Sequence, residues 1–290
     1  MRIVEIVFPI FAIISVGVVY GRLRSPNLEI ASQINLHVFI PCLIFTAIIQ
    51  QPFAAVTDFA LISAAVLIHL VPAIFALPII WLSKQSVQTL LPPAVFANAG
   101  NLGLPLFVLA FGEIALAPAV VLFLVMNILQ FTVGVRFLDR DILWRRVISQ
   151  PVLISAVLAI LYQLLELDLS QTLLMPIEML GQVAVPLMLF TLGSTLAGAQ
   201  FSEWRLGLYS GLMIPTIGVF SALLIILLLP LNDLQQRMLI LYGALPPAVL
   251  TFIFAQRYNQ EPGKVAAVVM IGNMLSVLII PLTLYFVLPE

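Results

Sequence analysis

The chain has 290 residues, of which 62% are hydrophobic and only 9% charged, and its mean hydropathy is +1.18. Soluble domains contain about 45–50% apolar and about 25% charged residues, so this composition excludes a soluble enzyme, a secreted disulfide scaffold, a disordered protein and a basic nucleic-acid binder. It predicts an all-α integral membrane protein in contact with the lipid bilayer. The net charge is −1, and Cys42 is the only cysteine, so neither an internal disulfide nor a cysteine-based metal cluster is expected.

Ten apolar segments are long enough to be transmembrane helices, at residues 3–21, 30–50, 58–82, 88–111, 114–137, 150–166, 173–198, 205–230, 235–257 and 264–288. Ten spans place both termini on one side of the membrane. That side receives two of the 12 Lys and Arg residues, and the other side receives the remaining ten. Because short basic loops stay in the cytoplasm, the sequence predicts both termini on the non-cytoplasmic side of the inner (plasma) membrane.

The segments form two matching sets of five. The motif LPPAV at 91–95 recurs at 245–249, and further pairs occur in register: Pro41 with Pro186, Thr46 with Thr191, and Asn127 with Asn273. An odd number of spans means that the second copy enters the membrane from the opposite face, as in the inverted repeats of many transporters. We therefore expect a first repeat at 1–137, a cytoplasmic connector at 138–149 and a second repeat at 150–290.

The fourth and ninth segments contain residues that interrupt helices. Proline lacks an amide donor, and glycine lowers the cost of non-helical backbone. Breaks are therefore predicted at Pro92, Pro93, Gly103 and Pro105 in the fourth segment, and at Pro246 in the ninth. A simple kink is the alternative for each proline.

Interrupted helices at equivalent places in two repeats indicate a binding site, because the freed N-termini of the half-helices attract anions. Unwound backbone at membrane depth is also tolerated only where it is buried in protein or lines a cavity. The sequence thus predicts a site for a small organic anion, formed by Ala97, Asn98, Gly100, Asn101, Pro247 and Thr251.

Two stretches, NAGNLGLPL at 98–106 and ALPPAVLTFIFAQRYN at 244–259, resemble the fourth and ninth helices of the auxin efflux carrier family. That family includes plant PIN carriers and bacterial malate/malonate permease-like proteins. The resemblance implies ten helices in two inverted bundles with crossing helices four and nine, a scaffold with a moving transport bundle, organic-anion transport and a homodimer. Asn98 falls where PIN carriers place a substrate-facing Asn, whereas Ala97 and Thr251 replace prolines of those carriers.

Other polar residues have two interpretations each. Asn127 and Asn273 either support the crossing or simply bond to neighbouring helices. Thr46 and Thr191 either line the site or satisfy backbone carbonyls, and His69 either takes part in proton coupling or faces a partner helix. No Asp or Glu lies near the middle of a predicted span, which argues against a cation/proton exchanger.

The sequence therefore predicts a secondary transporter, a permease or efflux carrier, that works by alternating access without cofactor or metal. There is no P-loop motif, so a gradient or the membrane potential must drive transport. A sodium-coupled organic-anion symporter resembling bile-acid carriers is the alternative. An intramembrane enzyme is not expected, because His37, His69 and one cysteine supply no nucleophile–base set, and a membrane sensor ranks below transport.

Overall fold

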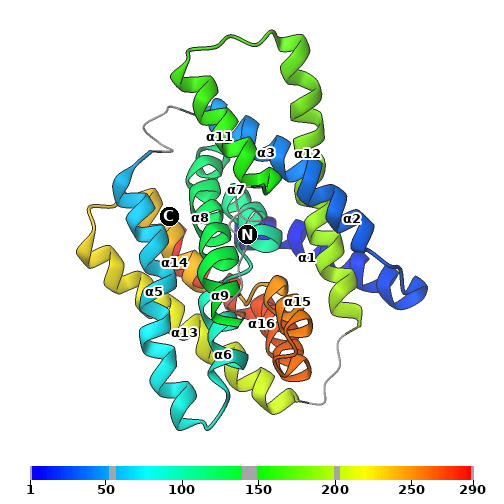
Figure 1. Ribbon diagram of the computed structural model, residues 1–290, viewed down its shortest axis with the longest axis vertical. Coiled ribbons are helices and arrows are strands. Elements are labelled where there is room, and N and C mark those ends of the chain that lie inside the picture. The colour runs from blue at the N-terminus through cyan, green and yellow to red at the C-terminus, as the bar shows by residue number, and fades with distance from the viewer. Residues whose placement is uncertain (1, 52–56, 139–148, 199–202, 289–290) are drawn as a thin grey trace.

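A computed structural model describes residues 2–51, 57–138, 149–198 and 203–288 (Figure 1). Within these ranges the chain is helical, and its only extended pairing is one isolated bridge between Ala97 and Pro247. Of the connector predicted at 138–149, residues 139–148 lie outside the described residues. The all-α expectation is confirmed for the part of the chain that is described.

Seven helical stretches in the described ranges are long and apolar enough to cross a membrane: Ile3–Arg24, Glu29–Ile49, Phe59–Leu82, Glu113–Gly134, Gln171–Ala197, Trp204–Leu228 and Pro262–Val287. Five of them contain the helices α1 (Arg2–Arg24), α5 (Phe59–Leu82), α12 (Gln171–Ala197), α13 (Trp204–Leu228) and α16 (Pro262–Val287). The other two are composite, with α2 (Glu29–Ile34), η1 (Asn35–Phe39) and α3 (Ile40–Ile49) in one, and η3 (Glu113–Ala115), α8 (Leu116–Leu129) and η4 (Gln130–Gly134) in the other. A short helix, α9 (Val135–Leu138), follows η4.

The three other predicted segments are also helical but are shorter or divided. The sixth is α11 (Pro151–Leu164). The fourth consists of α6 (Val87–Val95) followed by η2 (Ala99–Gly103) and α7 (Leu104–Phe111), and the ninth consists of α14 (Asp233–Gly243) and α15 (Val249–Arg257). Helix is thus present in all ten predicted segments, and the fourth and the ninth are each divided in two.

The position of the break in the fourth segment differs from the prediction. Pro92 and Pro93 lie inside α6, Gly103 ends the π-helical turn η2, and Pro105 lies in the first turn of α7. The φ angle that proline fixes is itself helical, and a proline in the first turn of a helix removes a donor that has no intrahelical partner anyway. These four residues therefore flank the break, whereas Pro246 lies between α14 and α15 as predicted.

The helices pack in two groups (Figure 1). The first group consists of α1, α3, α11 and α12, and the second consists of α5, α6, α8, α13, α14 and α16. In the second group α7 packs on α8 and α15 packs on α16, and η2 and α7 also contact α12 and α1 of the first group. The second half of the divided fourth segment therefore lies where the two groups meet.

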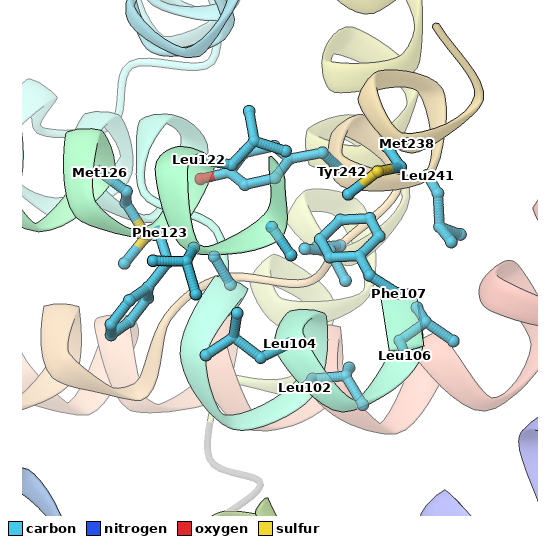
Figure 2. Close-up of a cluster of buried hydrophobic side chains, with 14 of the residues drawn as sticks. Leu102, Leu104, Leu106, Phe107, Leu122, Phe123, Met126, Met238, Leu241 and Tyr242 are labelled. Atoms are coloured by element: carbon cyan, nitrogen blue, oxygen red, sulfur yellow. The ribbon is translucent and has the colours of Figure 1, made fainter. Parts of the chain in front are cut away.

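A cluster of buried side chains fixes this half-helix in the second group (Figure 2). Leu104 and Phe107 of α7 pack among Leu122 of α8 and Tyr242 of α14, and all four are 2% exposed or less. The Phe107 and Tyr242 rings are stacked with their centroids 6.5 Å apart. The packing joins parts of both divided segments into one body.

Glycines bring α1 and α12 into backbone contact in the first group. A Cβ atom added at Gly193 would lie 2.0 Å from the Ile14 carbonyl oxygen, and one added at Gly17 would lie 2.2 Å from the Phe190 carbonyl oxygen. Small residues permit this approach, and close packing is a main source of helix association in membranes.

We predict that Gly193→Ala destabilises the protein, because the new methyl group meets backbone that cannot rotate away. Overpacking costs about 1–3 kcal/mol, so the thermal midpoint in detergent should fall by several degrees. Gly263→Ala is the control, since nothing lies within 4 Å of a Cβ atom there. Equal midpoints for Gly193→Ala and the wild type would show that α1 and α12 are not packed as described.

Candidate functional site

The breaks of the two divided segments pair with each other. The Asn98 N–H donates to the Pro246 carbonyl at 2.7 Å, and the Ala248 N–H donates to the Phe96 carbonyl at 2.9 Å. These two hydrogen bonds enclose the antiparallel bridge between Ala97 and Pro247. Unwound backbone inside a membrane needs such internal partners, because lipid supplies none.

Asn273 of α16 connects both breaks through its side chain. Its Oδ1 accepts from Asn98 Nδ2 at 2.9 Å, and its Nδ2 donates to the carbonyls of Pro247 at 3.0 Å and Val269 at 2.8 Å. Both asparagines are 3% exposed. Of the two interpretations of Asn273, the structure favours support of the crossing.

A pocket of about 120 Å³ lies beside the paired breaks. It is bordered by residues of the two breaks and the helices that follow them, of α8 and η4, and of the first group: Leu36, Ile40, Ala97, Asn98, Gly100, Asn101, Phe123, Met126, Asn127, Gln130, Met188, Ala248, Val249 and Leu250. Four of the predicted site residues (Ala97, Asn98, Gly100 and Asn101) are therefore brought together here, with the supporting residue Asn127.

Two helix N-termini meet at this pocket. The backbone N–H groups of Gly100 and Asn101 lie in the first turn of η2, and those of Val249 and Leu250 lie in the first turn of α15. Within the described chain none of these four N–H groups makes a hydrogen bond. Free N–H groups at a helix N-terminus carry partial positive charge and bind anions.

The pocket lining carries no charged side chain and four side-chain amides. Asn98 and Asn127 use their Nδ2 groups on Asn273 and on the Phe123 carbonyl, respectively. The Asn101 side chain makes no hydrogen bond with the described residues and is only partly buried. The arrangement can therefore solvate one small anion with neutral donors, and Asn101 has its amide free to do so.

Sequence reasoning missed Gln130, which begins the π-helical turn η4 and borders the pocket. It is 1% exposed, and neither its Nε2 nor its Oε1 has a hydrogen-bond partner among the described residues. A polar side chain inside the apolar segment 114–137 was the available signal, since such residues are rare within spans and usually face the protein interior.

Several predicted residues lie elsewhere. The Thr251 hydroxyl donates to the Ala248 carbonyl at 2.6 Å and does not border the pocket, and Pro247 contributes its carbonyl to Asn273 instead. Thr46 and Thr191 donate to carbonyls of their own helices, namely those of Cys42 and Met188, as intrahelical bonds. These hydroxyls are therefore occupied by local backbone.

His69 of α5 faces a partner helix. Its Nδ1 lies 2.6 Å from the Ala65 carbonyl, and its Nε2 lies 3.1 Å from the hydroxyl of Tyr242 in α14. The carbonyl can only accept, so Nδ1 carries the proton and Nε2 accepts from Tyr242. Both ring nitrogens are used in holding α5 to α14, which favours the structural interpretation.

Glu261 precedes α16 outside the spans and ties α6 to it. Its carboxylate accepts hydrogen bonds from Lys264 and from Thr89 of α6, and these bonds hold the pKa of the Glu261 carboxyl below its usual range.

Among the described residues, no group of three or more His, Cys, Asp or Glu side chains could hold a metal ion.

A larger cavity of about 530 Å³ lies between α1, α3 and α12 on one side and α7 and α8 on the other. Its lining includes the carboxylates Glu113 and Glu178 and no basic side chain. These charges repel an anion, so the smaller pocket beside the breaks is the better candidate for anion binding.

A family model described as "Membrane transport protein" matches residues 137–284, just over half of the chain. The chain is 25% identical over 309 residues to a protein of Rhizobium meliloti named "Putative malonate transporter", with 99% of this chain and 96% of that relative covered. It is also 22% identical to an uncharacterized transporter of Methanocaldococcus jannaschii, with 96% of each chain covered. With its apolar helices, the chain is a multi-pass membrane protein that belongs to the membrane transport protein family, the auxin efflux carrier family that its motifs resemble.

Proposed function

We propose that this transporter moves a small carboxylate-bearing organic anion across the inner (plasma) membrane by alternating access. The observation that carries the proposal is the meeting of two helix N-termini, with four free backbone N–H groups, at one uncharged pocket. A carboxylate can accept from several such groups at once, and the two helix dipoles both favour its negative charge.

The volume of the pocket limits the substrate. Its volume of about 120 Å³ is small beside the about 300–1,000 Å³ of ligand pockets for drug-sized molecules. We therefore expect the pocket to favour a solute with a few carbon atoms over an aromatic acid. The relative from Rhizobium meliloti is named for malonate, a three-carbon dicarboxylate, which makes malonate the first substrate to test.

The proposal includes two inverted five-helix repeats at 1–137 and 150–290, with both termini on the non-cytoplasmic side, and a homodimer as the family resemblance implies. The division of the fourth segment in the first repeat and of the ninth in the second supports this layout. The pocket also supports alternating access, because Ile40 and Met188 of the first group complete a lining formed otherwise by the second group. Leu36 of η1, which packs on α3 and α12, lies on the same side.

The direct test is uptake of radiolabelled malonate into proteoliposomes that contain the purified protein. We expect saturable uptake that depends on the membrane potential or on an ion gradient, and that small carboxylates inhibit more strongly than aromatic acids. Uptake that requires sodium would favour the symporter alternative. No uptake of malonate or of other small mono- and dicarboxylates, in either orientation of the gradients, would refute the proposed function.

The side chain of Asn101 should contribute to affinity and not to stability. A hydrogen bond to a charged group contributes about 1.5–3 kcal/mol, so Asn101→Ala should raise the KM for malonate about tenfold or more while the thermal midpoint stays unchanged. Asn98→Ala should lower both affinity and midpoint, because it leaves the buried Asn273 Oδ1 without the bond it accepts from Asn98. An unchanged KM for Asn101→Ala would remove Asn101 from the site.

The topology can be tested by labelling single cysteines in a Cys42→Ala background. Arg24, at the end of α1, and Asp168, between α11 and α12, are both exposed. In intact cells a membrane-impermeant maleimide should label Asp168→Cys, and Arg24→Cys only after the cells are opened. Labelling of both positions from the same side would contradict the proposed arrangement.

A further inference from the structure

Gln130 is the one side chain bordering the pocket whose amide is fully buried and wholly unpaired. It is 1% exposed, and both of its polar atoms lack partners among the described residues. A buried amide without hydrogen bonds is unfavourable and is rare in native proteins. An unpaired amide of this kind is explained if a ligand forms hydrogen bonds with it when bound. A solute in the adjoining pocket is in a position to do so.

The local backbone places Gln130 at this point. It begins η4, one of three π-helical turns in the described chain, and each of the three contributes a residue to the pocket: Leu36 from η1, Gly100 and Asn101 from η2, and Gln130 from η4. Short π-helical turns of this kind occur frequently at functional sites.

Contacts with both breaks hold η4 in position. A Cβ atom added at Gly134 would lie 2.8 Å from the Phe96 ring, so a larger residue there would require the ring to shift, and glycine allows this turn to pack closely against the end of α6. The rings of Phe131 and of Phe254 in α15 meet edge to face, with centroids 5.5 Å apart. The turn is therefore fixed relative to the helix N-termini that border the pocket.

We propose that Gln130 is a direct substrate ligand, which donates from Nε2 to a carboxylate oxygen of the transported anion. This inference rests on the proposed function and adds a specificity-determining residue to it. A neutral amide at this position accepts an anion without the desolvation cost of a buried cation. It also leaves the empty pocket uncharged.

The proposal makes opposite predictions for stability and for affinity. Gln130→Met keeps the length of the side chain and removes both unpaired polar atoms, so its thermal midpoint without substrate should equal or exceed that of the wild type. The KM for malonate in proteoliposomes should rise about tenfold or more, and the stabilisation of the wild type by saturating malonate should be lost. A structural glutamine would give the reverse pattern.

Gln163 supplies the matched control. Its Nε2 donates to the carbonyls of Ile48 at 2.8 Å and Gln51 at 2.7 Å, and so connects α11 with the end of α3. Gln163→Met should lower the thermal midpoint and leave the KM within about twofold of the wild-type value. The same substitution therefore separates a substrate ligand from a structural amide.

A second variant tests the charge of the ligand. Gln130→Glu has nearly the same shape but places a carboxylate beside the bound anion, so malonate uptake at neutral pH should fall to the background of empty vesicles. Wild-type kinetics in Gln130→Met or Gln130→Glu, or a Gln130→Met protein that no longer folds, would overturn the assignment. Failure of the wild type itself to transport any small carboxylate would instead refute the proposed function.

Discussion

The need to satisfy unwound backbone inside a membrane is the constraint on which the site depends. Two separate breaks would each expose polar groups to lipid, whereas here they pair through the bonds from Asn98 to Pro246 and from Ala248 to Phe96. Asn273 adds two further bonds across the same junction. The pairing leaves the N–H groups in the first turns of η2 and α15, those of Gly100, Asn101, Val249 and Leu250, without hydrogen bonds in the described chain. The arrangement that makes the breaks tolerable thus also leaves free the donors on which the proposed anion binding depends.

The general architecture could be predicted from sequence because it follows from periodic and composition-level signals. Apolar length located the helical segments, and repetition of LPPAV located the two that are divided. The point of the break could not be predicted from proline alone. Pro92 and Pro93 continue α6, and the chain leaves the helix at Phe96, where pairing with Ala248 replaces the helical bonds. That pairing is a tertiary contact between segments about 150 residues apart.

Some side chains of the candidate site could be predicted from the sequence, and others could not. Asn98 and Asn101 could be found because they flank the predicted break, and Asn273 because it matches Asn127 across the repeats. Gln130 has no such match, and its importance depends on a π-helical turn and on the absence of a partner, which only coordinates reveal. Thr251 was predicted to line the site but does not border the pocket. Its hydroxyl donates to the Ala248 carbonyl one turn earlier, a hydrogen bond that threonine often makes in membrane helices.

The packing of the helices suggests how such a site could face both sides in turn. The junction of the breaks belongs to the second group, where Leu104, Phe107, Leu122 and Tyr242 bind α7, α8 and α14 into one body (Figure 2). Ile40 and Met188 of the first group, with Leu36 of the adjoining η1, complete the lining, and all three are apolar. If the two groups slide past each other, as the proposed alternating access requires, every polar group proposed to bind the anion moves with the second group. Only the apolar side of the lining then changes. Apolar contacts are non-directional and tolerate sliding, whereas hydrogen bonds would have to break. This division of the lining is therefore compatible with the proposed movement, in which the anion would keep its polar ligands.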